Sequence, residues 1–383
     1  MRLVTLRLRA FRAHEDSVFT PVRNVNVLWG DNGAGKTNLI EAVSVLALGR
    51  SFLGASERVM LRREAAFFEL EGTFQGARRA AQTIRVFYSP EEGKRVFVNG
   101  VSQERLSALV GLVPHVVLSP ADYELTAGGP AERRRFLDTV LSQSYPAYLA
   151  DLVAYRRVLR QRNALLAQYR GRPPGESGLE AWNDELAQFA SRIAARRRRF
   201  LEDFAPFVAR AHEALGLEAQ QPRARYAPSV DGDDAPGSYL DALERLARRE
   251  RELRRTLAGP HLDEVVFTLD GADVRAYASQ GQHRMLSLVL RLATAFFLED
   301  FLDEAPLLLV DDLFGTLDPQ RSRAVRALLA SDALGQSLVT TADRRALGDD
   351  LSGGASAAAL PEDARFAFYE VTNGTVRPPE VVE

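Results

Sequence analysis

A glycine-rich stretch near the amino terminus limits what this chain can fold into more than any other feature. Eight consecutive residues fit the pattern GxxxxGK[ST] in full: Gly30, Asp31, Asn32, Gly33, Ala34, Gly35, Lys36 and Thr37. A strand is predicted directly before them, at 25–29, and a helix directly after. Glycines permit positive φ, so successive N–H groups can face phosphate oxygens at the start of a helix. The context predicts a phosphate-binding loop (P-loop), and the alternative is a glycine-rich turn before an ordinary helix.

Side chains at the end of this loop are assigned to nucleotide chemistry. Lys36 is expected to reach the β- and γ-phosphates of ATP, and the Thr37 hydroxyl is expected to hold Mg²⁺. We include Asn38, the next residue, among the nucleotide contacts. Composition supports the role of Lys36, because Lys36 and Lys94 are the only lysines among 49 basic residues. A flexible ammonium suits that position, whereas a planar guanidinium does not.

A second motif combines a buried strand with two acids. Leu307 to Val310 are predicted to form a parallel strand that ends in Asp311 and Asp312. We expect Asp311 to orient Mg²⁺, and Asp312 to polarise the attacking water or sense the γ-phosphate. The alternative is a strand end with solvated acids.

A third motif, Ser279, Gln280, Gly281 and Gln282, lies between a strand-like run at 274–277 and a predicted helix at 285–298. By itself it is typical of a helix N-cap. Its position before the acidic strand favours a second interpretation, in which Ser279 and backbone N–H groups bind a γ-phosphate. Because residues 38–278 separate the Ser279–Gln282 motif from the P-loop, we predict that the phosphate bound by this motif lies on another subunit. ATP would then hold a homodimer together.

Length and composition exclude several classes of protein. A chain of 383 residues is long enough for two or three domains. The net charge of −2 shows no global basic footprint, so any contact with nucleic acid must be local. The absence of cysteine excludes disulfides, thiolate metal sites and cysteine nucleophiles. We find no apolar run long enough to span a membrane and expect no membrane partner and a cytoplasmic protein.

The predicted elements divide the chain into a split α/β head, 1–125 and 258–383, and an inserted helical lobe, 126–257. Helical spacing of apolar residues dominates the lobe, most clearly from Trp182 to Phe207, where Pro206 is expected to bend or end the helix. Further strands of the head are predicted at Leu3–Leu8, Phe67–Phe74, Thr83–Tyr88, Arg95–Val98, Val265–Leu269, Ser337–Thr341 and Phe366–Val371. Loops are predicted at 171–175 and 221–238.

Arginine clusters accompany the helical lobe. They comprise Arg133–Arg135, Arg156, Arg157, Arg160, Arg162, Arg196–Arg199, Arg248, Arg249, Arg251, Arg254 and Arg255. Each cluster alone is typical of a solvated helix face, since acids are interspersed. Together they predict a patch that binds the phosphate backbone of DNA without reading its sequence.

The chain resembles the RecF family of bacterial recombination-repair proteins, which are ABC-type ATPases related to SMC heads. The matching stretches are the P-loop, Leu8–Arg12, Leu48–Phe52, Val98–Gly100, Leu118–Asp122, Glu132–Asp138, Tyr155–Asn163, Gly259–His261, Ser279–Arg284 and the Asp311–Asp312 pair. The resemblance implies an ABC-type head, in which a mixed β layer and a parallel sheet with helices carry an inserted all-α lobe. It also implies ATP-dependent dimers that bind single- and double-stranded DNA, slow DNA-stimulated hydrolysis, and work with RecO and RecR to load recombinase at gaps in repair and the SOS response.

Further residues are carried over from the family by position. Arg12 resembles an early nucleotide contact, Ser119–Asp122 occupy the place of the Q-loop, Asp318 ends the D-loop, and Thr340–Thr341 stand at the place of a switch histidine. We include Asp318 and Thr341 among the nucleotide contacts. The chain departs from the family or from wider ABC proteins at Leu262, at Phe314–Thr316, and in lacking a Q-loop glutamine.

Slow turnover is also expected from Asp312 itself, because its side chain is one methylene shorter than the usual glutamate and holds a lytic water less closely. Three alternatives stay open at this point. They are an ABC transporter ATPase subunit, a phosphotransferase acting on a small molecule, and a DNA-binding scaffold with vestigial ATPase activity.

Overall fold

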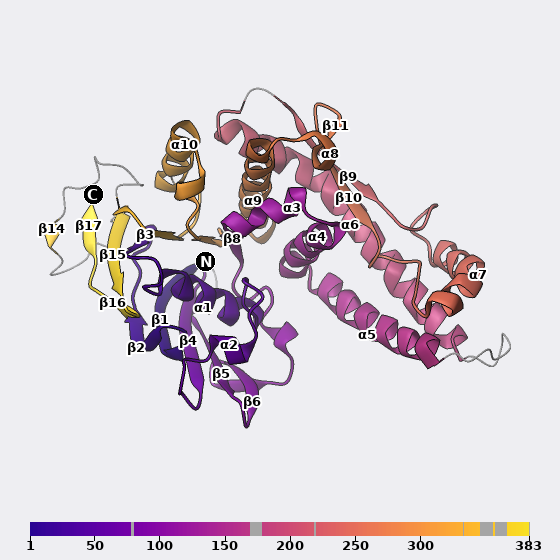
Figure 1. Cartoon of the computed structure of the whole chain (residues 1–383), viewed down its shortest axis with the longest axis horizontal. Coiled ribbons are helices and arrows are strands. Elements are labelled where there is room, and N and C mark those ends of the chain that lie inside the picture. The colour runs from indigo at the N-terminus through magenta and orange to yellow at the C-terminus, as the bar shows by residue number, and fades with distance from the viewer. Residues whose placement is uncertain are drawn as a thin grey trace. The chain divides into compact units, whose positions relative to one another are not determined.

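The computed structural model describes residues 1–77, 80–168, 178–217, 220–331, 333–344, 355–356 and 366–382. The loop predicted at 171–175 lies outside these residues. The chain forms two compact units (Figure 1). The first unit contains Met1–Asp122, Arg210–Glu218 and Leu288–Glu383, and the second contains Tyr123–Ala209 and Ala219–Ser287. In the part of the chain that the structure describes, no helix is both long and apolar enough to cross a membrane.

One layer of the first unit is an antiparallel sheet. Its strand order is β2-β1-β4-β5-β6-β7. The strands are β1 (Arg2–Phe11), β2 (His14–Phe19), β4 (Phe68–Gln75), β5 (Gln82–Ser89), β6 (Gly93–Val98) and β7 (Val101–Gln103). Buried and less buried residues alternate along β4, as expected of a sheet with one face on the core.

The second layer of this unit is a sheet with a parallel centre. Its order is β14-β17-β15-β3-β13-β12-β8, with β16 beside β15, and the pairs from β15 to β8 are parallel. The strands are β3 (Val25–Trp29), β8 (His115–Leu118), β12 (Leu307–Val310), β13 (Ser337–Thr341), β14 (Ala355–Ser356), β15 (Phe366–Thr372), β16 (Thr375–Val376) and β17 (Glu380–Val382). The predicted parallel strand before Asp311 is confirmed, and all four of its residues are buried.

Helix α1 (Lys36–Leu48) packs against strands of both layers, namely β4 and β5 of one and β13 of the other. It is apolar on nearly all sides and buries ten residues, because a helix between two sheets has no wet face. Since α1 begins directly at Lys36, this packing fixes the end of the P-loop. The other helices of the unit are α2 (Glu57–Met60), α10 (Pro319–Ala330), most of α9 (Gln280–Leu302), and the 3₁₀ turns Leu106–Ala108, Pro120–Asp122 and Phe314–Thr316.

The second unit is mainly helical but also contains a sheet. Its helices are α3 (Tyr123–Ala127), α4 (Pro130–Ser144), α5 (Pro146–Gln168), α6 (Glu180–Ala214, to Ala209), α7 (Pro236–Leu253), α8 (Val274–Tyr277) and the first residues of α9. Strands β9 (Pro222–Ala227), β10 (Glu264–Leu269) and β11 (Ala272–Asp273) pair in the order β11-β10-β9.

Four predictions are corrected here. Residues 258–287 pack with the helical unit and not with the head, because β10 pairs with β9. For the same reason the predicted loop at 221–238 contains a strand. The strand-like run at 274–277 is the helix α8, whose N-terminus the Asp273 side chain caps. Pro206 lies inside α6, so it does not end the helix, and a bend at this proline stays a prediction.

Burial of His115 makes the stability of the first unit depend on pH. His115 lies in β8, its Nδ1 is 3.0 Å from the Val113 carbonyl oxygen, and burial lowers its pKa to about 4. The folded state therefore favours the neutral ring, whereas the unfolded chain takes up a proton once the pH falls below about 6.5. The contribution of this site to stability is present above pH 6.5 and is lost as the pH falls towards 4.

We predict that wild type loses about 2 kcal/mol more of its free energy of unfolding than His115→Gln does when the pH falls from 7 to 5. Glutamine can still donate to Val113 but does not titrate. Urea denaturation followed by circular dichroism at both pH values measures the difference. Equal losses in the two proteins would contradict this account of His115.

Candidate active site

The P-loop has the backbone of a phosphate cradle. Gly30, Gly33 and Gly35 have φ of 147°, 84° and 109°, a region that residues with a side chain rarely adopt. A Cβ at Gly30 would lie 2.3 Å from the carbonyl oxygen of Val371, so only glycine fits there. A Cβ at Gly33 would meet nothing within 4 Å, which leaves the outer side of the loop open. The exposed rim of the loop consists of Asp31, Asn32 and Gly33.

Lys36 lies under this loop with its ammonium turned back onto the backbone. Its Nζ donates to the carbonyl oxygens of Gly30 at 2.7 Å and Asp31 at 2.8 Å. Burial lowers the pKa of Lys36, and the carboxylates of Asp312, Asp31 and Asp311 oppose that shift. The Lys36 ammonium is therefore held against the backbone of the P-loop, where an anion bound by the loop would contact a partly desolvated positive charge.

The Asp311 carboxylate joins the P-loop helix to two strands of the parallel sheet. Its Oδ1 accepts hydrogen bonds from Thr37 Oγ1 and Thr340 Oγ1, each at 2.7 Å. Burial raises the pKa of Asp311, the two threonine bonds lower it, and the neighbouring Asp312 raises it further. Thr37 and Asp311, predicted to share a metal ion, thus meet although 274 positions separate them in the chain. An oxygen-only donor set of hydroxyl and carboxylate fits Mg²⁺.

Asp312 extends from the same strand end in an unusual backbone conformation. Its φ is 44°, which is uncommon for a residue other than glycine. Its N–H donates to Thr340 Oγ1 at 2.9 Å, which holds this turn, and its side chain is exposed. The turn directs one acid to the interior and the other to solvent, as a division of roles between Asp311 and Asp312 requires.

Sequence reasoning missed a buried brace behind the P-loop. His14 Nε2 lies 3.0 Å from the Gly35 carbonyl oxygen, and its Nδ1 lies 3.0 Å from Ser17 Oγ. Ser17 Oγ donates to the carbonyl of Gly374, whose own N–H donates to Ala34. These bonds tie the loop to β2 and to the turn after β15. No motif in the sequence marks His14, because its partners are backbone atoms far along the chain.

Arg12 is held by an acid that the sequence analysis did not single out. Its guanidinium makes two hydrogen bonds with the buried carboxylate of Glu41 on α1, at 2.7 and 2.8 Å. Asn38 Oδ1 accepts from the N–H of Ala13 at 3.4 Å, beside Arg12 in the chain. The structure gives both residues a bracing role beside the P-loop. Their contact with nucleotide stays a prediction.

The remaining predicted residues of the first unit have partners within that unit. Asp318 caps α10 by accepting from the N–H of Arg321 at 3.0 Å. Thr341 Oγ1 donates to the carbonyl of Asp343, so it is Thr340 and not Thr341 that contacts the acidic pair. At the Q-loop position, Asp122 forms an ion pair with Arg291 of α9 at 2.7 Å.

The segment Ser279–Gln282 belongs to the second unit and begins helix α9. The N–H of Gln282 donates to Ser279 Oγ at 3.3 Å, and the N–H of Ser279 donates to Gln282 Oε1 at 2.7 Å. This reciprocal pair is a capping box, so the N-cap interpretation holds. Gln280 and Gly281 are exposed at the same helix start. A capped and exposed N-terminus can still present N–H groups to a phosphate, and that role stays a prediction.

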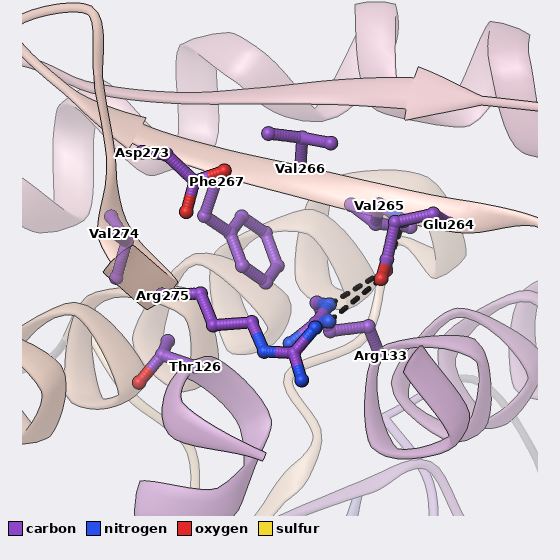
Figure 2. Close-up of a pocket in the computed structure, with 9 residues that line it drawn as sticks. All are labelled: Thr126, Arg133, Glu264, Val265, Val266, Phe267, Asp273, Val274 and Arg275. Atoms are coloured by element: carbon purple, nitrogen blue, oxygen red, sulfur yellow. Dashed lines mark hydrogen bonds and ion pairs between the residues drawn. The ribbon is translucent and has the colours of Figure 1, made fainter. Parts of the chain in front are cut away.

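A pocket of about 90 Å³ in the second unit is lined by residues of α3, α4, α8 and the strands β10 and β11 (Figure 2). Arg133 is buried there and makes two hydrogen bonds with Glu264, at 2.7 and 2.8 Å. Arg275 extends into the pocket beside it. Arg133 therefore belongs to the interior and is not available to a DNA backbone.

Two more arginines of the predicted patch are buried in the same way. Arg197 donates to Asp138 at 2.8 Å and to the carbonyl of Pro260 at 2.7 Å. Arg162 donates to Glu250 at 2.5 Å. The Pro260 contact gives the Gly-Pro-His turn a structural role, independent of the departure at Leu262. Some arginines of the predicted DNA-binding patch therefore form ion pairs in the core of the second unit.

We predict that Arg162→Ala lowers the free energy of unfolding by about 3–5 kcal/mol, because it leaves the buried Glu250 carboxylate without its cation. The matched control Arg157→Ala, at a side chain 62% exposed and paired with Glu185, should cost about 1 kcal/mol or less. Urea denaturation of both variants compares them. Similar losses would mean that the buried pair has no special role.

Known proteins match this chain over most of its length. The family model described as RecF/RecN/SMC N terminal domain matches residues 2–350. The chain is 46% identical over 352 residues to the DNA replication and repair protein RecF of Salinibacter ruber, covering 90% of this chain and 85% of that protein. It is 40% identical over 352 residues to the protein of that name from Chloroherpeton thalassium, covering 90% and 96%.

Solved structures agree with these relatives. A structure of the recombination mediator protein RecF with ATP, in the RecFOR pathway, matches with a TM-score of 0.86 at 26% identity, covering 98% of this chain and 97% of that one. An Smc head domain from Pyrococcus furiosus matches with a TM-score of 0.56 at 14% identity, covering 99% and 96%, which supports the fold alone. The ABC-type α/β head fold is thereby confirmed, and the chain belongs to the RecF family of DNA replication and repair proteins.

Proposed function

We propose that this protein is an ATP-dependent DNA-binding switch that acts as a homodimer in replication and repair. ATP binding would join two copies around single- or double-stranded DNA at gaps or junctions, and slow hydrolysis would release it. The observation that carries this proposal is the meeting of Lys36, Thr37 and Asp311 beneath an open glycine loop. The structure with ATP supports it by similarity.

The loop and its side chains fit ATP with Mg²⁺. Thr37 and Asp311 would hold Mg²⁺, which neutralises charge on the phosphates when bound. The Lys36 ammonium would exchange its two backbone carbonyls for phosphate oxygens, since its bonds all lie within the P-loop. The N–H groups at the start of α1 would face the same phosphates.

Hydrolysis would depend on Asp312 as the group that orients water. Its short side chain, on a turn held by Thr340, limits how closely it approaches a water that attacks in line. Ser279, Gln280, Gly281 and Gln282 would contact the γ-phosphate bound by the partner copy, with Asp318 and Thr341 nearby. The resulting enzyme is a switch with slow turnover, stimulated by DNA.

DNA contacts are assigned to the arginines that stay exposed. Arg249, Arg254 and Arg255, at the end of α7, are exposed, and none of them forms an ion pair within the described residues. Arg160 on α5 is also exposed. Unpaired guanidinium groups can neutralise phosphates without reading bases.

Family membership extends the proposal to partners. RecR- and RecO-type proteins would work with this dimer to load recombinase, in the cytoplasm and in support of the SOS response. Membership also disfavours a transporter ATPase subunit. A switch of this kind requires that ATP and DNA each tighten the binding of the other.

The test is fluorescence anisotropy with a labelled, gapped duplex, measured with and without ATP and Mg²⁺. ATP should tighten DNA binding by wild type at least about tenfold. Lys36→Met should abolish that effect, whereas Lys94→Met, at the only other lysine, should retain it. Arg254→Glu/Arg255→Glu should weaken DNA binding with and without ATP. It should also reduce the slope of log K against log salt concentration by about two, because two phosphate contacts are lost.

Two outcomes would contradict the proposal. Equal DNA affinity of wild type with and without ATP would favour a scaffold with vestigial ATPase activity. Transfer of phosphate from ATP to an acceptor other than water would favour a phosphotransferase.

A further inference from the structure

A groove of about 450 Å³ lies between helix α6 and strand β9 of the second unit, and no role assigned above uses it. We call it the α6–β9 groove. It is lined by Arg198, Leu201, Glu202, Phe204, Ala205 and Val208 of α6 and by all residues from Pro222 to Tyr226 of β9. In Figure 1 these two elements run side by side. From the rise per residue of a helix and of a strand, the lining segments of α6 and β9 are each about 15 Å long.

One edge of β9 carries main-chain groups that no strand satisfies. β9 is the last strand in the order β11-β10-β9, and within the described residues no other strand pairs with it. The N–H of Asp270 donates to the carbonyl of Gln221, which makes this pair hydrogen-bonded. Hydrogen-bonded pairs alternate with non-hydrogen-bonded pairs along an antiparallel ladder. The main-chain N–H and C=O of Arg223 and Arg225 therefore bond to β10, whereas those of Ala224 point away from β10. The N–H and C=O of Ala224 therefore face the free edge.

The opposite wall of the groove is apolar. Leu201, Ala205 and Val208 recur at helical spacing on one side of α6 and line the groove together with Phe204. The ring of Tyr226 lies 5.7 Å from the guanidinium of Arg198 on this helix, so the face of β9 that carries Tyr226 is directed to α6. This wall can take apolar side chains from a strand laid along β9.

The other face of β9 carries unpaired positive charge. Arg223 and Arg225 are exposed, and two-residue spacing places them on the same face of the strand. Neither forms an ion pair within the described residues. Arg198 is different, because Asp234 pairs with it through two bonds of 2.9 Å. Among the described residues, Glu202 is the one acid that lines the groove.

We propose that the α6–β9 groove binds an extended, acidic segment of a partner protein, which adds as a fourth strand beside β9. The main chain of that segment would pair with Ala224, its apolar side chains would enter the groove, and its alternate carboxylates would face Arg223 and Arg225. A DNA backbone fits this surface less well. It has neither apolar side chains for the α6 wall nor N–H groups for the free carbonyl of Ala224.

The probe is a display library of random eight-residue peptides, selected on the full-length protein. Enriched peptides should alternate acidic and apolar residues. Ala224→Pro removes the outward N–H without touching a bond to β10, and it should reduce retention of these peptides at least about tenfold. Arg223→Glu/Arg225→Glu should reduce it to a similar degree. Enrichment without an acidic and apolar alternation, or equal retention on Ala224→Pro, would overturn the proposal.

A second pair of variants tests the groove without altering β9. Ala205→Trp fills the groove and should also reduce retention at least about tenfold. Ala195→Trp, at an exposed alanine of the same helix that does not line the groove, should leave retention within about twofold of wild type. Circular dichroism melting confirms that each variant is folded.

Duplex binding tests the remaining alternative, in which Arg223 and Arg225 contact DNA and not a peptide. Arg223→Glu/Arg225→Glu should bind labelled duplex within about twofold of wild type. A loss of duplex affinity of more than about tenfold, together with unchanged peptide retention, would identify the surface as a DNA contact and overturn the proposal.

Discussion

The hydrogen-bonded Asp311 carboxylate is the contact on which the first unit depends. It accepts from Thr37 at the start of α1 and from Thr340 on β13, while it lies itself at the end of β12. One oxygen thereby sets the distance between the P-loop helix and two neighbouring strands. The bonds also stabilise the charged form of a buried acid, against the effect of burial and of Asp312. A displacement of α1 would therefore disturb the proposed phosphate, metal and water positions together.

Ion pairs have a comparable role in the second unit. Arg133, Arg162 and Arg197 are each buried against a carboxylate, and each connects segments far apart in the chain. Buried pairs of this kind fix geometry more than they add stability, because desolvation offsets most of the attraction. The arginine content of this unit is thus divided between a structural interior and a surface, and only surface groups such as Arg254 are free to meet phosphates.

The sequence predicted best where local pattern and tertiary environment agree. Strands β3, β12 and β13 were predicted with their observed ends, because β12 is a continuous apolar run and β3 and β13 are short segments rich in Val, Leu or Thr. The meeting of Thr37 with Asp311 followed from the motif alone. Strand β9 was missed because Pro-Arg-Ala-Arg-Tyr-Ala begins with proline and contains no β-branched residue, and it is the pairing with β10 that makes it extended. Glu41 and His14 were missed because their partners are set by the fold. Thr341 was predicted as a nucleotide contact, whereas its neighbour Thr340 is the residue that bonds Asp311.

The central claim is that each ATP is bound by the P-loop of one copy and the Ser279 segment of the other. The most direct test mixes Lys36→Met protein with Ser279→Arg protein in equal amounts and measures ATP hydrolysis in the presence of DNA. Each variant alone should be inactive. In a two-fold dimer the mixed pair contains one site built from two intact halves. Random pairing then restores about one quarter of the wild-type rate. A mixture as inactive as its components would contradict a shared site and confine Ser279 to capping its helix.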